Sequence, residues 1–513
     1  MGKLISRRTL IKAAIPAGAC VAAGLAGMAY FRRGPARPNI VLVIADSMRA
    51  DQLSRKFDGR SITPVLDSIA SQGASFTRAY AGASWTRCSV ASLFTGAFTP
   101  YHGVTRTATT ISSRCDTLAK LLKRHGYRTY GLICNGWIGA DVRQSGGKRV
   151  PDHSYGFAQG FDRYQLIEAK KDERGQVEAW APADAMTDVA ADLVRSARAP
   201  FFLYVHYMDT HYPWVGTEPT PFTGKYSAPG DDVQAALKAN RQLVTSSYWV
   251  GATSKPSGDV LAEDKRPRLV AVADESVSFV DSQVGRLLDV LAQTGALANC
   301  AFIFTSDHGE EYWERGQVGH GQTLFDEVLH VPLLIKAPNI SSCAVAEPVS
   351  TVGIYETAKY LSGALDTTAP VMAPSLAPYA GAQPLSEPQK LYAQLDMFCE
   401  LTTLRKLMQP AGREIISRSD AGGVERFQTY DLTSDPAELH PIDAVGAGDL
   451  RAQLDAVRKE AIAVGYRMGV DRPASSIDWQ VGAERAALGD QVPQAYDPRD
   501  REMLQQMKAL GYL

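Results

Sequence analysis

The stretch Asn39–Ile44, NIVLVI, followed closely by Asp46, decides the predicted fold. After Asn39 every residue of this run is apolar, and most are β-branched. A half-exposed strand would alternate apolar and polar residues, so a continuous apolar run predicts a strand buried on both faces, as in a parallel sheet. Three later runs share this character, at 129–134, 201–206 and 301–305.

Helical patterns separate these strands. Residues 64–71 follow Thr63, a residue type that caps helices, and they begin with a proline, which suits a first helical turn. Residues 117–125 stop at Gly126, and residues 269–291 form the longest helical pattern. Strand and helix therefore alternate, which predicts an α/β fold with a doubly wound, mostly parallel sheet flanked by helices.

The length of 513 residues predicts more than one structural unit. The boundaries follow from composition, because residues 215–266 are rich in Pro, Gly, Ser and Lys and residues 369–388 are rich in Pro and Ala. We expect an N-terminal segment at 1–37 and a main α/β domain at 38–368, with an insertion at 215–266 that includes a helix at 231–243. After a linker at 369–388, we expect a smaller C-terminal α+β unit at 389–470, with a helix at 449–465, and a wrapping tail at 471–513.

The N-terminal segment looks like a twin-arginine export signal. Arg7 and Arg8 precede a mostly small and apolar run at 13–31, the charged-then-apolar order of an export signal. We therefore expect the twin-arginine export machinery as a partner and a periplasmic location. The apolar run is near the length that spans a bilayer, so the protein is either soluble after cleavage or held in the inner membrane by a single anchor.

The overall charge excludes some partners. Lys plus Arg number 54 and Asp plus Glu number 55, giving a net charge of −1. No global field therefore attracts nucleic acid or an anionic membrane, and an anionic substrate must be held by a local site. The seven cysteines are odd in number and form no CxxC pair, which indicates neither a cysteine zinc site nor a disulfide scaffold.

Two acidic residues stand directly after predicted strands. Asp46 follows the first strand, and Asp307 with His308 follows the run at 301–305. Carboxyl ends of parallel strands are where open α/β sheets place ligands, although each acid alone is also explained as a helix cap or a turn. Together they predict a divalent metal site, and an oxygen donor beside an imidazole suits Zn, Mn or Fe more than Mg alone.

A third segment, residues 84–96, is rich in small residues and hydroxyls and includes Thr86 and Cys88. A hydroxyl at a helix N-terminus gains from the helix dipole as it becomes an alkoxide, which suits a nucleophile. A helix with a Ser or Thr cap explains the same segment without chemistry.

These segments together resemble the sulfatase family of the alkaline phosphatase superfamily, from Pro38 to about Pro338. The resemblance implies an alkaline phosphatase/sulfatase-like fold and a metal-dependent hydrolase of anionic esters. The matching motifs are PNIVLVIADSMRAD (38–51), SLFTGAFTPYHGV (92–104), FTSDHGEE (304–311), GHGQTLFDEVLHVPLLIKAP (319–338), DLTSDPAE (431–438) and the terminal MKALGYL (507–513).

The chain departs from the family at the nucleophile. Formylglycine sulfatases carry Cys-x-Pro-x-Arg, but after Cys88 the Pro and Arg positions hold Val90 and Ser92. Counting back from the Thr-Gly at 95–96 instead places Thr86 at the nucleophile position. The resemblance therefore implies attack by Thr86, with a formylglycine made from Cys88 as the alternative.

A threonine nucleophile changes the expected chemistry. A formylglycine hydrate releases sulfate by collapsing to an aldehyde, whereas a threonine ester must be attacked again at sulfur or phosphorus. We expect a hydrolase of sulfate or phosphate/phosphonate esters that forms a covalent intermediate on Thr86. The alternatives are an envelope phospho-headgroup transferase with the same chemistry, and a non-catalytic binding protein on a sulfatase frame.

The resemblance also implies the metal ligands Asp46, Thr86, Asp307 and His308. Many sulfatases carry a second Asp where this chain has Ser47. Calcium prefers six to eight oxygen ligands, so the loss of one favours Mn or Zn over Ca as the single divalent ion.

Further residues match substrate positions of the family. His211 and His320 are expected to donate a proton to the leaving group and to bind the anionic ester. Arg87 and Asn135 are expected to contact the ester, although a turn-forming role explains Asn135 equally well. His206 lies within an apolar run and is interpreted as a buried structural residue.

Overall fold

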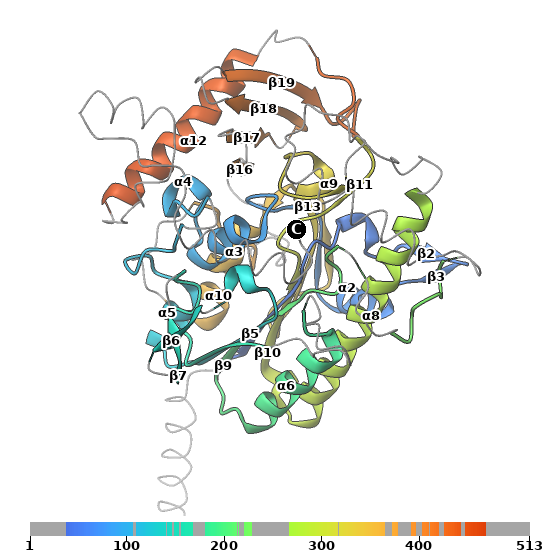
Figure 1. Cartoon of the computed structure of the whole chain (residues 1–513), viewed down its shortest axis with the longest axis vertical. Coiled ribbons are helices and arrows are strands. Elements are labelled where there is room, and N and C mark those ends of the chain that lie inside the picture. The colour runs from blue at the N-terminus through green and yellow to red at the C-terminus, as the bar shows by residue number, and fades with distance from the viewer. Residues whose placement is uncertain are drawn as a thin grey trace, which may run out of the picture.

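The fold is that of a computed structural model, shown in Figure 1. The structure describes residues 37–105, 109–139, 141–145, 148–152, 155–167, 180–212, 214, 220–227, 266–315, 318–364, 372–377, 391–396, 403–409, 411–419, 425–442 and 447–467. The apolar run at 13–31, most of the insertion, its helix at 231–243 and the tail at 471–513 lie outside these residues. None of the helices in the described part combines the length and apolarity needed to cross a membrane.

A nine-stranded sheet forms the centre of the main domain. Strands β10, β1, β9, β5 and β8 run parallel, and β13 is antiparallel to both β10 and β4. The predicted doubly wound, mostly parallel sheet is thereby confirmed. In spatial order the strands are β14 (Cys343–Val345), β4 (Ala74–Tyr80), β13 (His330–Lys336), β10 (Cys300–Thr305), β1 (Asn39–Ala45), β9 (Phe201–Tyr207), β5 (Arg128–Ile133) and β8 (Arg163–Leu166), with β15 (Val349–Ser350) beside β4.

Helices cover both faces of this sheet, because β1 is apolar on both (Figure 1). Ile40, Leu42 and Ile44 join one core cluster, and the alternate residues Val41 and Val43 join the other. Burying such a side chain contributes roughly 1.5–3 kcal/mol. The first cluster includes residues of α3 (Thr86–Thr95), α5 (Leu118–Arg124) and α10 (Ile354–Ser362), and the second includes residues of α2 (Pro64–Gln72), α6 (Ala183–Ser196) and α8 (Arg266–Gln293).

The C-terminal unit is a four-stranded antiparallel sheet covered by one long helix, at the top of Figure 1. The strands are β16 (Leu391–Asp396), β17 (Thr403–Met408), β18 (Arg413–Ser419) and β19 (Glu425–Asp431), and the helix is α12 (Ala447–Arg467). Leu450 and Leu454 of the helix pack in one cluster with Leu407 and Ile415 of the sheet. This arrangement confirms the predicted smaller α+β unit.

Short elements complete the described part. They are the hairpins β2 (Lys56–Phe57) with β3 (Arg60–Ser61), β6 (Asp141–Ser145) with β7 (Lys148–Asp152), and β11 (Glu311–Tyr312) with β12 (Val318–Gly319), and the short helices α4 (Thr99–His102) and α9 (Asp326–Leu329).

Candidate active site

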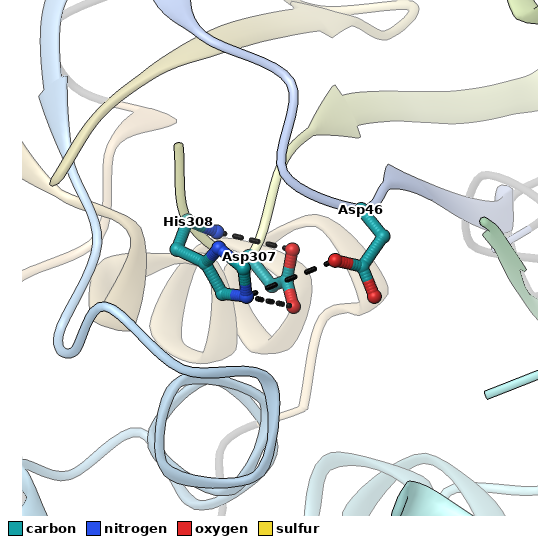
Figure 2. Close-up of side chains that lie close together, drawn as sticks. All are labelled: Asp46, Asp307 and His308. Carbon is teal, nitrogen blue, oxygen red and sulfur yellow. Dashed lines mark hydrogen bonds and ion pairs between the residues drawn. The ribbon is translucent and has the colours of Figure 1, made fainter. Parts of the chain in front are cut away.

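Asp46 and Asp307, the two acidic residues predicted to follow strands, lie close together at the carboxyl ends of those strands (Figure 2). Strand β1 pairs in parallel with β10, so Asp46 and Asp307 leave neighbouring strands at the same end. One donor atom each from Asp46, Asp307 and His308 lies within 4.8 Å of the others, and all three residues are buried. The structure therefore brings together three of the four predicted metal ligands from positions far apart in the sequence.

The contacts inside this cluster leave an unsatisfied oxygen. His308 Nε2 lies 3.4 Å from Asp307 Oδ2 and 3.7 Å from Asp46 Oδ1. Asp307 Oδ1 accepts the His308 N–H at 3.0 Å, but among the described residues Oδ2 has no hydrogen-bond partner. A buried acceptor without a partner costs about 1–3 kcal/mol or more, and a bound cation would satisfy it. The donor set, two carboxylates and an imidazole, fits a divalent metal ion.

The turns that carry these ligands are sterically defined. Ser47 has a φ of +62°, and its Oγ donates to Asp46 Oδ1 at 3.0 Å. At Gly309 an added Cβ would lie 2.2 Å from the Glu327 carbonyl oxygen, so only glycine fits there. The Asp307-His308 turn is thus pressed against the segment before β13.

Thr86 is the fourth predicted ligand. It is the first residue of α3, and its Oγ1 lies 3.2 Å from His308 Nε2 and 3.5 Å from Asp46 Oδ2. Cys88, two positions later, belongs to an apolar cluster with Tyr80 and Leu329. Residues i and i+2 face different sides of a helix, so the threonine hydroxyl faces the acidic cluster and Cys88 belongs to the neighbouring core.

Asp46 is held by two further residues. Asn135 Nδ2 donates to its Oδ2 at 3.0 Å, and His206 Nε2 lies 2.9 Å from the same oxygen. Burial opposes ionisation of Asp46, but the hydrogen bond from His206 and the charges of His211, His206 and His308 lower its pKa below the usual value. The carboxylate is therefore kept ionised and ready to bind a cation.

The roles expected of these two residues need refinement. Asn135 was expected to contact substrate or form a turn; its Oδ1 accepts the Trp137 N–H at 2.9 Å, so it caps a turn while its amide binds Asp46. His206 is buried, as interpreted, yet it contacts Asp46 and its Nδ1 lies 2.7 Å from the Tyr204 hydroxyl. Its position near the carboxyl end of β9, beside β1, is the signal that could have identified it as a site residue.

Two further histidines and a glutamate lie beside the cluster. The rings of His308 and His320 are 4.2 Å apart between centroids, and those of His320 and His211 are 4.8 Å apart. Burial, together with the charges of His308 and His211, lowers the pKa of His320 well below its usual value. Sequence reasoning missed Glu310, whose carboxylate lies 2.8 Å from His320 Nδ1; burial raises its pKa to about 7.

Arg87 lies differently from the expectation. Its guanidinium donates to the backbone oxygens of Trp137, at 3.1 Å, and of Thr109, and it lies 4.2 Å from the Tyr155 ring centroid. The side chain is fully buried. These contacts give Arg87 a structural role, and none of them supports the predicted contact with an anionic ester.

Comparison with known proteins agrees with this geometry. A family model described as Sulfatase matches residues 38–364. The chain belongs to the sulfatase family. Among curated sulfatases, Uncharacterized sulfatase YidJ of Escherichia coli K12 is 24% identical over 503 residues, covering 91% of this chain and 94% of that protein.

Solved structures share the sulfatase fold. Phosphonate monoester hydrolase of Agrobacterium radiobacter aligns with a TM-score of 0.64 and 23% identity, covering 83% of this chain and 96% of that one. A protein solved with its substrate D-glucosamine-2-N,6-O-disulfate aligns with a TM-score of 0.62 and 19% identity, covering 83% and 98%. This sulfatase-family chain is an ester hydrolase; family members depend on a metal ion, and Asp46, Asp307 and His308 form a cluster able to hold one.

Proposed function

We propose that this sulfatase-family protein hydrolyses sulfate or phosphate/phosphonate esters through a covalent intermediate on Thr86. The observation that carries the proposal is the place of the Thr86 hydroxyl, 3.2 Å from His308 Nε2 and within the Asp46 cluster. Cys88, the position that a formylglycine would need, belongs to the apolar cluster instead. Both the sequence count and the geometry therefore favour the threonine.

Asp46, Asp307 and His308, with Thr86, would hold a single divalent ion. Such an ion polarises ester oxygens and lowers the pKa of a hydroxyl beside it. The mixed oxygen and nitrogen donors, with Ser47 in place of a second acid, favour Mn or Zn over Ca. Elemental analysis of the purified protein would identify the ion.

The proposed reaction consists of two nucleophilic displacements at the sulfur or phosphorus atom of the ester. Thr86 Oγ gives up its proton to solvent and attacks the sulfur or phosphorus atom, and the bond to the leaving-group oxygen breaks. That oxygen takes the Nε2 proton of an imidazolium, His211 or His320, which is left neutral and regains a proton from solvent. Water then attacks the same atom, the bond to Oγ breaks, and the Thr86 hydroxyl re-forms with a proton from that water. A threonine ester has no aldehyde to collapse to, so this second attack is required.

The first experiment is a paired rate assay. Purified protein of known metal content is given p-nitrophenyl sulfate, p-nitrophenyl phosphate, a phosphate diester and a phosphonate monoester. We expect Thr86→Ala to lose turnover by about 10³-fold or more, as for loss of a nucleophile, while keeping its metal. Cys88→Ala serves as the matched control and should lose activity only modestly, through packing.

The opposite pattern would overturn the proposal. If turnover survives in Thr86→Ala and vanishes in Cys88→Ala, and mass spectrometry finds an aldehyde at position 88, the protein is a formylglycine sulfatase. The preference among the four substrates then separates sulfate from phosphorus chemistry in either case.

A further inference from the structure

The Glu310 carboxylate joins the two segments that carry His211 and His320. Its Oε1 lies 2.8 Å from His320 Nδ1, and its Oε2 accepts the N–H of Tyr212 at 3.1 Å. Glu310 is fully buried. One side chain thus contacts two loops that are separated by about a hundred residues in the sequence, and it does so directly beside the Asp307-His308 turn.

These contacts orient both rings. When Nδ1–H is bound by a carboxylate or carbonyl, the ring is held in one orientation and Nε2 is left for the chemistry, as an acceptor in the neutral ring and as a proton donor in the imidazolium. His320 turns Nδ1 toward Glu310, and His211 turns Nδ1 toward the carbonyl of Tyr212, whose N–H is bound by Glu310. In both histidines Nε2 is therefore the nitrogen directed away from this unit.

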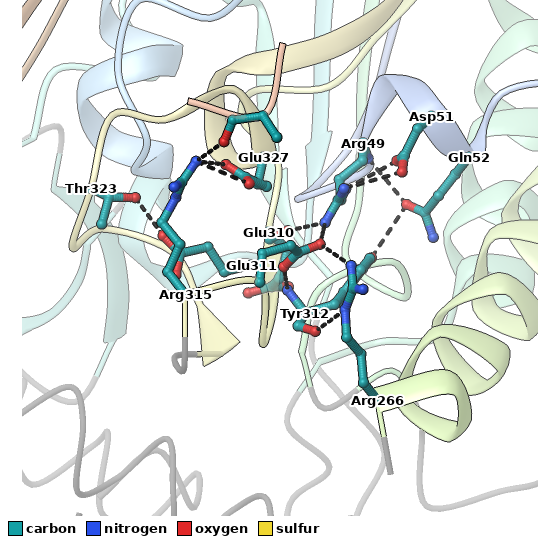
Figure 3. Close-up of polar contacts among 12 residues, drawn as sticks. Arg49, Asp51, Gln52, Arg266, Glu310, Glu311, Tyr312, Arg315, Thr323 and Glu327 are labelled. Atoms are coloured by element: carbon teal, nitrogen blue, oxygen red, sulfur yellow. Dashed lines mark hydrogen bonds and ion pairs between the residues drawn. The ribbon is translucent and has the colours of Figure 1, made fainter. Parts of the chain in front are cut away.

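The backbone of Glu310 is held independently of its side chain (Figure 3). Arg49 Nη1 donates to the Glu310 carbonyl at 3.1 Å and pairs with Glu314 at 2.5 Å. Arg266 pairs with the same Glu314 carboxylate at 2.8 Å. The loop after the metal-ligand turn therefore keeps its anchors when the Glu310 side chain is changed.

We propose that Glu310 is a positioning residue for the leaving-group step, which holds His320 and the turn of His211 so that their Nε2 atoms face the departing oxygen. The inference rests on the proposed function, since it concerns the same ester cleavage. Glu310 itself touches neither the nucleophile nor the metal ligands through its carboxylate in the contacts above; it acts through the histidines.

The test uses a series of esters whose leaving groups differ in basicity. A nitrophenolate departs with little protonation, whereas a phenolate or alkoxide needs a proton. For Glu310→Gln we expect a loss of about tenfold or less with the nitrophenyl ester, rising to about 10²–10³-fold with the alkyl ester, at unchanged metal content. An equal loss across the series would overturn the inference.

Glu311→Gln is the matched control. Glu311 is the next residue and is also fully buried, but its carboxylate accepts from Thr323 Oγ1 at 2.5 Å. We expect this variant to show the same leaving-group dependence as the unaltered protein. A steep dependence in Glu311→Gln as well would mean that any disturbance of this loop produces the effect, and the inference would fail.

A double-mutant cycle decides whether Glu310 acts through His320. In a His320→Ala background, Glu310→Gln should lower the rate with the alkyl ester by less than about threefold, and this remainder is the effect exerted through the turn of His211. In the protein with His320 intact, Glu310→Asp should lose less activity than Glu310→Gln. Fully multiplicative losses would overturn the inference. Failure of the proposed function is recognised separately, because Thr86→Ala would then retain turnover with every ester.

Discussion

Among the described residues, two clusters of mostly buried acidic residues are neutralised differently. Asp46 and Asp307 meet with His308, and Asp326, Glu414 and Glu438 meet at a second point. In the second cluster Lys406 Nζ lies 3.1, 2.9 and 2.7 Å from the three carboxylates in turn. In the part of the chain that the structure describes, no lysine or arginine forms an ion pair with Asp46 or Asp307.

The Lys406 cluster is a structural contact between two parts of the fold, whereas the Asp46 cluster is suited to hold an exchangeable ion. Lys406 on β17 binds acids from α9, from β18 and from the turn after β19, so its ammonium connects the C-terminal sheet to the main domain. Burial raises the pKa of Glu414, which opposes ionisation of this carboxyl group beside Glu438. In the described part of the chain, histidines rather than an ammonium face the Asp46 cluster, so a bound cation would complete its charge balance.

The largest effect is expected from Asp307→Ala. Removal of this carboxylate leaves too few donors to hold the ion, so metal and activity should be lost together, with a fall in kcat/KM of about 10³-fold or more. Elemental analysis and the ester assays measure both quantities in one preparation. A variant that keeps a full equivalent of metal would show that the ion is not held by Asp307.

Lys406→Met tests the other cluster. The acids would lose their cation while remaining buried, so the free energy of unfolding should fall by roughly 3–5 kcal/mol, as measured by denaturant titration. The metal content of the Asp46 cluster should not change. Addition of Glu414→Gln and Glu438→Gln should recover part of the loss, and an unchanged stability in Lys406→Met would remove the distinction drawn above.

Glu311 is a third case, a buried acid that among the described residues pairs with no lysine and belongs to no metal-ligand cluster. Burial raises its pKa from 4.5 to about 8, so the folded state holds a proton that the unfolded state releases. Its contribution is fully present below about pH 4.5 and is lost as the pH rises toward about 8. Between pH 6 and 7 the loss is at most ~1.4 kcal/mol. Stability measured across this range should depend less on pH in Glu311→Gln; identical slopes would show that Glu311 is ionised.

The sequence predicted the features that depend on local pattern. The continuous apolar runs predicted the strands β1, β5, β9 and β10, and residues that stand directly after β1 and β10 led to Asp46, Asp307 and His308. The count back from Thr95-Gly96 led to Thr86, which the structure places in the same cluster. The export signal at residues 6–12 remains a prediction, because it lies outside the described residues.

The missed residues depend on distant partners. Glu310 contacts Tyr212, and Lys406 contacts Asp326 and Glu438, across long separations in the sequence that no local pattern encodes. Arg87 is the reverse case: its place beside the nucleophile suggested an anion contact, and the structure shows its guanidinium donating to the backbone of residues 109 and 137. Adjacency in sequence says little about direction on a helix.

The central position of β1 has a consequence for synthesis. Ile40 pairs with Phe202 and Asn39 pairs with Cys300, so both neighbours of this strand are made long after it. At ~5–20 residues per second, the strand waits roughly 10–50 s for them on the ribosome. During that time NIVLVIA is an apolar segment with unpaired edges, of the kind that associates with other chains. The aggregation hazard during synthesis therefore falls on the segment that directly precedes Asp46.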